Sequence, residues 1–174
     1  IAEERVFNPA SYSYPVRKWL LRDLADLRVL QYALQRRKVR PRFERYQAWN
    51  EAAGDLGFIY TFLSYSGLGY LISRYMGVEN TILAIYDHPA EVERFVQTVN
   101  ETNLRMLDEI IDGPFQTLIV GDNHDAQVQS PALFKRFTYD YYTELARRLH
   151  QAGKYLAVHV DGEMRGLLRL LDEC

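Results

Sequence analysis

Residues 117–122 read Thr-Leu-Ile-Val-Gly-Asp, and this stretch contains the clearest strand of the chain. Its apolar run is short, rich in β-branched residues and preceded by a Gly-Pro turn signal at 113–114, which predicts a buried strand. Residues 155–160, Tyr-Leu-Ala-Val-His-Val, and residues 57–63, Gly-Phe-Ile-Tyr-Thr-Phe-Leu, have the same character. Strands that are apolar throughout, rather than alternating, are typical of a sheet covered on both faces.

Helical segments lie between these strands. A proline at a first-turn position and apolar residues in a helical period predict a long helix over residues 89–111. The alternation of strands and helices with short connections favours a parallel sheet, either open or closed into a barrel. Further helices are predicted at 16–36, from Pro41 towards Gly54, at 68–76, from Asn80, from Ser130 to Gln151 and from Gly162 to Cys174.

We interpret the chain as one α/β domain, residues 1–174, with a helical lead-in over 1–56 and βα units over 57–174. Three predicted strands form only part of an eight-stranded barrel. The first residue is not methionine and the last follows a predicted helix directly, so we expect a cut chain. Because an unclosed barrel leaves sheet edges bare, we expect a homodimer or completion by the remainder of the barrel.

The composition is that of a globular protein. Of the 174 residues, 48% are hydrophobic and 25% are charged, and the formal net charge is -2. The lack of a basic excess argues against a nucleic-acid partner, and no apolar run is long enough for a membrane span. The single cysteine, Cys174, excludes an internal disulfide and fits a reducing, cytoplasmic compartment.

Polar side chains follow each predicted strand. In parallel α/β folds the ligand site lies at the carboxyl ends of the strands, so these positions are the first candidates for function. They are Asp122, Asn123, His124 and Asp125 after the second strand, His159 and Asp161 at the end of the third, and residues 64–67 after the first.

We expect Asp122, His124, His159 and Asp161 to face one cavity, with the segment Tyr65–Tyr75 in its wall. Asp122 and Asp161 would then carry like charges across a small pocket. A metal ion, a cationic substrate group or a raised carboxyl pKa would offset their repulsion.

The spacing His159-Val160-Asp161 places both polar side chains on one side of an extended backbone. Such a pair can hold a divalent metal, or the carboxylate can orient the histidine for acid/base chemistry. The alternative is a structural histidine satisfied by a neighbouring carboxylate. For residues 122–125 the alternative is a run of polar side chains that only shapes a turn.

Other polar features are weaker candidates. His88 precedes a proline at a helix entry, and His150 lies near a helix C-terminus, where it suits the helix dipole. The tyrosines at 139, 141 and 142 are typical of packing, and the basic run over 36–45 is typical of a solvated face. The sequence contains no glycine-rich phosphate loop, GxSxG or CxxC motif.

From about Tyr14 to Cys174 the sequence resembles the uroporphyrinogen decarboxylase superfamily. This superfamily includes the decarboxylase of the haem pathway and the zinc-dependent, corrinoid-linked methyltransferases. The resemblance rests on the order and spacing of several segments: Gly57-Phe58 with the aromatic and glycine stretch to Tyr75, residues 86–92, Gly121-Asp122-Asn123 leading to residues 130–134, and Leu149–Gly153 followed by His159–Gly162.

The resemblance implies a (β/α)8 TIM barrel, present here in part. In the methyltransferase branch it implies a zinc ion and a corrinoid protein as methyl donor, and in the decarboxylase branch no cofactor. From the strand-end positions together with the resemblance, we expect catalytic roles for Asp122, Asn123, His124 and Asp161, substrate binding by Tyr65, Tyr75 and Asp125, and metal ligation by His159 and Asp161.

Two departures from the family patterns bear on the activity. Asn123 stands where the decarboxylase has a serine, and Asp161 stands where the methyltransferase zinc motif His-x-Cys has a cysteine. The first hypothesis is metal-assisted methyl transfer on a small molecule. The second is metal-free decarboxylation of uroporphyrinogen or a related polycarboxylate in porphyrin biosynthesis, with Asp122 stabilising positive charge on the substrate. The third is a non-catalytic binding relative.

Overall fold

The computed structural model describes all 174 residues, and at its centre lies a parallel sheet of three strands. Both pairings are parallel, which confirms the predicted α/β fold, and the sheet is open, as in part of a (β/α)8 barrel. Leu118 of the central strand lies between Thr61 and Leu156 of its neighbours. The strands, in order across the sheet, are β3 (Thr61–Phe62), β4 (Thr117–His124) and β5 (Tyr155–Val160).

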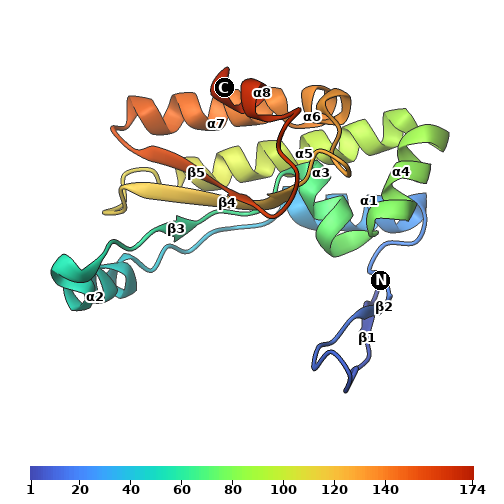
Figure 1. The fold of residues 1–174 in the computed structure, drawn as a ribbon, viewed down its shortest axis with the longest axis horizontal. Coiled ribbons are helices and arrows are strands. Elements are labelled where there is room, and N and C mark those ends of the chain that lie inside the picture. The colour runs from blue at the N-terminus through green and yellow to red at the C-terminus, as the bar shows by residue number, and fades with distance from the viewer.

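Eight helices accompany this sheet, with the two longest along one side of it (Figure 1). They are α1 (Leu24–Gln35), α2 (Phe43–Ala53), α3 (Gly67–Tyr70), α4 (Val78–Asp87), α5 (Pro89–Asp108), α6 (Pro131–Phe137), α7 (Tyr139–Gln151) and α8 (Leu168–Asp172), with a 3₁₀ turn η1 (Gly54–Leu56) and a π-helical turn η2 (Leu71–Tyr75). Helices α5 and α7 run along the sheet, and α1 packs against α5. None of these helices combines the length and apolar character that crossing a lipid bilayer requires.

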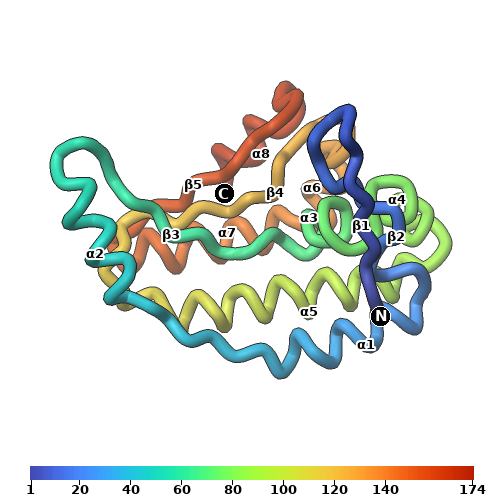
Figure 2. The backbone as a smooth tube through the Cα atoms, turned by 90° about the horizontal axis from the view of Figure 1, so that it is seen from below, coloured from blue at the N-terminus to red at the C-terminus, as the bar shows by residue number.

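The two faces of the sheet differ in their cover. On one face Leu118 and Val120 of β4 are fully buried in a cluster with Leu149 of α7. On the other face Phe62 and Tyr155 remain 56% and 65% exposed. Figure 2 views the strands from this uncovered side, with α7 behind them. The prediction that both faces are covered is therefore wrong for this chain, because its helices cover only one.

The first helix begins later than predicted. Val16 belongs to β2 (Val16–Lys18), which forms an antiparallel hairpin with β1 (Glu4–Arg5) that projects from the helices (Figure 1). Helix α1 starts at Leu24 because the side chain of Asp23 accepts a hydrogen bond from the backbone N–H of Asp26 (2.9 Å). A capping aspartate therefore sets the boundary, although the leucine period continues upstream of it.

Strand β3 is shorter than the predicted strand over 57–63. It is an edge strand that pairs only with β4, and its ladder covers Thr61 and Phe62. One further backbone bond joins the N–H of Leu63 to the carbonyl of Ile119 (3.0 Å). Residues 57–60 do not pair with β4, so this apolar stretch is not part of the strand.

The two C-terminal helices also differ from the predictions. The helix predicted from Ser130 to Gln151 is divided at Thr138, and the amide of Asn100 donates to the carbonyl of Phe137 (3.3 Å) at the break. The predicted helix over 162–174 is reduced to α8. Its first part is a loop held by the backbone bond from Ala126 N–H to the carbonyl of Glu163 (2.6 Å).

Candidate active site at the carboxyl ends of the strands

The carboxyl end of β4 carries three of the predicted site residues. Asp122, Asn123 and His124 are part of the strand, whose pairing with β5 is irregular between Val120 and His124. Asn123 has a φ of 51°, a left-handed conformation that asparagine tolerates better than most residues. The side chains of Asp122 and His124 are fully buried, and Asn123 between them is exposed.

A hydroxyl group from α7 joins the two buried side chains. The oxygen of Tyr142 lies 3.0 Å from Oδ2 of Asp122 and 3.0 Å from Nε2 of His124. Nδ1 of His124 lies 3.1 Å from Oε1 of Gln129. Oδ1 of Asp122 accepts the backbone N–H of Ser66 (2.6 Å). Every polar atom of the carboxyl and the imidazole thus has a partner, as burial requires.

Burial changes the pKa of both titratable groups. Loss of hydration raises the pKa of the Asp122 carboxyl, an effect that His124 and the hydrogen bonds from Ser66 and Tyr142 oppose. The same loss of hydration lowers the pKa of His124, an effect that Asp122 and Gln129 oppose. Each group is therefore shifted towards its uncharged form.

His159 and Asp161 lie at the end of β5 in a different environment. Their side chains are 50% and 54% exposed, and Nδ1 of His159 lies 3.5 Å from Oδ1 of Asp161. The structure thus brings together the pair that the spacing predicts. Leu156 and Val158 point towards the helices, so alternation places His159 on the uncovered face.

The four predicted residues do not face one cavity. Asp122 and His124 have no exposed surface, whereas His159 and Asp161 are open to solvent. The reason is that the buried side chains of β4 point under the helices, where Tyr142 meets them. In place of one cavity that all four side chains face, the structure has two separate Asp/His pairs.

Asp125 lies next to the loop that follows β5. Its Oδ1 accepts the backbone N–H of Gln127 (2.9 Å), which forms the turn after β4. Its side chain also packs against Gly162, where an added Cβ would collide with the carboxyl group. The backbone N–H of Gly162 donates to the carbonyl of His124 (3.2 Å). Asp125 therefore shapes a turn and also borders the loop that contains Asp161.

The segment between Tyr65 and Tyr75 divides into two environments. Nη2 of Arg74 donates to the hydroxyl of Tyr65 (2.9 Å), and the guanidinium carbon lies 5.1 Å from the centre of that ring. The Tyr65 ring lies beside Phe62, with 6.3 Å between ring centres, at the uncovered face. Tyr75 instead stacks on Tyr70 at 4.8 Å and packs in the apolar cluster of α1, α4 and α5, where burial raises the pKa of its phenol.

The residues present do not fit a zinc site by themselves. Zinc in proteins takes three or four His, Cys, Asp or Glu ligands, and no three such side chains of this chain lie close enough together to hold a metal ion. His159 and Asp161 form only a pair. The thiol of Cys174 donates to the carbonyl of Leu170 (3.1 Å) at the end of α8. A zinc ion at His159 and Asp161 would therefore need a further ligand from another group.

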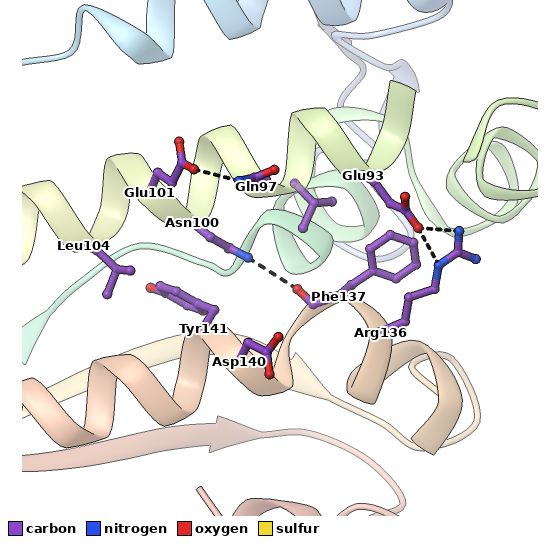
Figure 3. Close-up of a pocket in the computed structure, with 10 residues that line it drawn as sticks. Glu93, Gln97, Asn100, Glu101, Leu104, Arg136, Phe137, Asp140 and Tyr141 are labelled. Carbon is purple, nitrogen blue, oxygen red and sulfur yellow. Dashed lines mark hydrogen bonds and ion pairs between the residues drawn. The ribbon is translucent and has the colours of Figure 1, made fainter. Parts of the chain in front are cut away.

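A pocket of about 420 Å³ lies in the helical layer between α5, α6 and α7 (Figure 3). Arg136 pairs with Glu93 across one end of it (2.6 Å), and Asn100 bonds the carbonyl of Phe137 beneath it. The pocket contains none of the predicted site residues. It is therefore not the candidate active site.

Sequence reasoning missed Arg74, Gln129 and Tyr142, and it named Ser66 only as one of residues 64–67, without a role. From the sequence, the tyrosines of α7 are predicted only to pack. A buried tyrosine hydroxyl usually needs a hydrogen-bond partner, and this rule could have identified Tyr142. Arg74 could have been identified from the sequence, because it is a cation among the tyrosines of the predicted cavity wall. Ser66 and Gln129 contribute through backbone and amide contacts that no spacing rule predicts.

Comparison with known proteins identifies a family. The family model described as Uroporphyrinogen decarboxylase (URO-D) matches residues 65–174, which include β4, β5 and every predicted site residue. No curated protein matches the sequence. The matched residues are more than half of the chain and include two strands, β4 and β5, of the three-stranded parallel sheet, so the chain belongs to the uroporphyrinogen decarboxylase family.

Proposed function

We propose that this chain supplies an acid/base pair and an anion-binding arginine to an active site that decarboxylates a small polycarboxylate, such as uroporphyrinogen. The observation that carries the proposal is the exposed pair His159 and Asp161 at the end of β5, on the uncovered face. Arg74 and Tyr65 follow β3 on the other side of β4. Neighbouring strands are ~4.8 Å apart, so the ends of β3 and β5 lie about 10 Å from each other across β4, a span that suits a small molecule.

In this proposal each side chain has a separate task. The guanidinium of Arg74, held by the Tyr65 hydroxyl, pairs with a carboxylate that the substrate retains. The rings of Phe62 and Tyr65 pack against the apolar part of the substrate. Asp161 orients the imidazole of His159 through Nδ1. When the carbon–carboxylate bond breaks, its electron pair stays on carbon and carbon dioxide leaves. That carbon then takes a proton from His159.

The test is turnover of uroporphyrinogen by the protein that carries this chain, measured as carbon dioxide released and as porphyrins separated after oxidation. His159→Gln should lower kcat by a factor of ~100 or more, because general acid–base groups contribute 10²–10⁴-fold. His150→Gln, an exposed histidine on α7, is the matched control and should leave kcat unchanged. Equal rates for the two variants would contradict the proposal. Binding of uroporphyrinogen without turnover by the wild type would instead support the non-catalytic binding relative.

Metal-assisted methyl transfer from a corrinoid protein is the second candidate. It is favoured by the 3.5 Å contact of His159 with Asp161, which would provide two ligands to a zinc ion. A third donor would have to come from another group, since no third His, Cys, Asp or Glu of this chain is near. Elemental analysis of the purified protein distinguishes the candidates. Stoichiometric zinc that is lost in Asp161→Asn would favour methyl transfer, and wild-type turnover without zinc would favour decarboxylation.

The uncovered face of the sheet requires a partner in either case. Phe62 and Tyr155 expose more than half of their surface there, and β3 and β5 each have an unpaired edge. We propose that a second copy or further strands of a barrel cover this face. Light scattering of the 20.4 kDa chain alone should give a mass above that of a monomer. A folded 20.4 kDa monomer would contradict this proposal.

A further inference from the structure

The buried residues Asp122, Tyr142, His124 and Gln129 form a continuous hydrogen-bonded chain whose protons can be counted. The amide nitrogen of Gln129 donates to the backbone carbonyl of Asp122 (3.4 Å), which fixes the orientation of the carboxamide. Its Oε1 therefore faces Nδ1 of His124 at 3.1 Å. A carboxamide oxygen only accepts hydrogen bonds, so Nδ1 of His124 carries a hydrogen.

Two contacts remain between the carboxyl group and the imidazole. One joins Oδ2 of Asp122 to the Tyr142 oxygen, and the other joins that oxygen to Nε2 of His124, both at 3.0 Å. Each contact needs one hydrogen, so two are required, and the Tyr142 hydroxyl supplies only one. If neither Oδ2 of Asp122 nor Nε2 of His124 carried a hydrogen, one of the two contacts would place two lone pairs against each other. If both carried one, one of the two contacts would place two hydrogens against each other.

We propose that Asp122 and His124 share one proton through the hydroxyl of Tyr142, and that Tyr142 is thereby a positioning residue for the carboxyl end of β4. The shared proton lies on the carboxyl group, with a neutral imidazole, or on the imidazole, with a carboxylate. The pair has no net charge in both forms, which suits side chains with no exposed surface. The opposite pKa shifts caused by burial favour the form with an uncharged carboxyl and imidazole.

The other titratable groups around this network are phenols and a thiol. They come from three elements: Tyr70 of α3, Tyr141 of α7 and Cys174 after α8. Burial raises the pKa of the Tyr141 phenol and of the Cys174 thiol, so neither supplies a charge at neutral pH. The proton count therefore depends on Asp122 and His124 alone.

The network connects two parts of the proposed active site. Oδ1 of Asp122 accepts the N–H of Ser66, directly after Tyr65, and the Ser66 hydroxyl accepts the N–H of Gly69 at the start of α3. A Cβ at Gly69 would collide with the Asp122 carboxyl, so the two elements approach closely. On β4 the exposed Asn123 is held between the two buried anchors. A role of this network in positioning catalytic groups rests on the proposed function, whereas the number of protons in the network does not.

The matched pair of tyrosines on α7 provides the experiment. Tyr142 bonds both Asp122 and His124, whereas the hydroxyl of its neighbour Tyr141 is buried without a hydrogen-bond partner and the ring lines the pocket of Figure 3. The protein is labelled with ¹⁵N-histidine, and the ring signals are followed from pH 5 to 8. The signal of His124 is assigned by its absence in His124→Gln.

In the wild type the His124 ring should keep one spectrum over this range, with a hydrogen on Nδ1. Tyr141→Phe should give the same spectrum, and Tyr142→Phe should give a spectrum that changes with pH. A His124 signal that titrates in the wild type, or a Tyr142→Phe spectrum identical to that of Tyr141→Phe, would overturn the proposal.

A second variant keeps the test valid if Tyr142→Phe does not fold. Asp122→Asn replaces the shared proton with an amide hydrogen, so both contacts of the Tyr142 hydroxyl can still be made. The His124 spectrum in this variant should stay constant from pH 5 to 8, as in the wild type. Titration of His124 in Asp122→Asn would contradict a shared proton. These readouts do not involve turnover, so they stand apart from the test of the decarboxylase proposal.

Discussion

Neighbouring strands β4 and β5 each end in an aspartate and a histidine two residues apart, and the two pairs have opposite environments. Asp122 and His124 are fully buried and bridged by Tyr142, whereas His159 and Asp161 are about half exposed and contact each other. The residue types and the spacing are the same. The two pairs lie on opposite faces of the sheet. Their environments differ because α7 covers the face with Asp122 and His124, and nothing in this chain covers the other face.

This difference separates a structural role from a chemical one. A buried pair with every polar atom bonded cannot reach a substrate unless the helices move, and it holds the backbone around it in place. An exposed pair at a strand end can reach a substrate and contributes little to packing. Substitutions in the two pairs should therefore have opposite effects on stability and on turnover.

The largest difference in stability is expected between the two histidines. His124→Ala should cost about 2–4 kcal/mol of unfolding free energy, because it leaves a cavity and removes the bonding partner of Tyr142 and Gln129. His159→Ala should change it by less than about 0.5 kcal/mol, since the side chain is exposed. Urea unfolding followed by circular dichroism measures both. Equal losses would show that the two environments do not differ in solution.

The pH dependence of stability should reveal the shared proton. Unfolded Asp and His titrate near ~3.9 and ~6.5, so between these values the unfolded pair binds one proton, as the folded pair does, and its contribution is flat. Above pH ~6.5 the unfolded pair binds none while the folded pair keeps one. Since folding then takes up a proton, stability should fall by about 1.4 kcal/mol per pH unit.

The sign follows from the two shifts. The raised pKa of Asp122 contributes stability that is lost as pH rises, and the lowered pKa of His124 contributes stability that is lost as pH falls. Between pH ~3.9 and ~6.5 these two contributions to stability cancel, and above pH ~6.5 only the contribution of Asp122 still changes with pH. Chemical unfolding from pH 5 to 8 checks this, with Asp122→Asn as the comparison. The fall above pH ~6.5 should be absent from that variant, and a fall of the same size in it would argue against the assignment to Asp122.

A smaller effect is expected from the two tyrosines of α7. Tyr142→Phe should cost about 1–2 kcal/mol, because it leaves buried Asp122 and His124 without a bridging hydroxyl. Tyr141→Phe should be neutral or slightly stabilising, since its buried hydroxyl has no partner to lose. Thermal unfolding of the two variants side by side gives the difference. A larger loss for Tyr141→Phe would reverse the roles assigned to the two hydroxyls.

The smallest effect is expected at Asn123. With a φ of 51° its backbone is in a region that disfavours a Cβ, and asparagine tolerates it better than alanine does. Asn123→Ala should therefore cost about 1 kcal/mol, and Asn123→Gly should cost nothing or stabilise slightly. Unfolding midpoints of the two variants test this. A glycine variant less stable than the alanine variant would mean that the side chain, and not the backbone, matters there.

Much of the fold could be predicted from the sequence, and the reasons are local. The strand at 155–160 and the helix from Pro89 follow from β-branched runs and from helical periodicity, which act within a few residues. The short β3 could not be predicted, because its length depends on register with Ile119. The break at Thr138 could not either, since it coincides with a bond from Asn100 on another helix.

The site could be predicted only in part. The rule that strand ends carry function selected His159 and Asp161, and the contact between them is present. The rule does not say which face a side chain occupies at an irregular strand end, so it grouped Asp122 and His124 with them. The partner that buries these two, Tyr142, comes from a helix distant in sequence.

The most direct test of the difference between the two pairs is the turnover of uroporphyrinogen by Asp161→Asn, measured together with its unfolding free energy. The change is isosteric and exposed, and Asp172→Asn on α8 is the matched control. We predict that Asp161→Asn lowers kcat by about tenfold or more, because the carboxylate that orients His159 is lost, with no change in stability. A wild-type kcat in Asp161→Asn would contradict the assignment of the chemistry to the exposed pair.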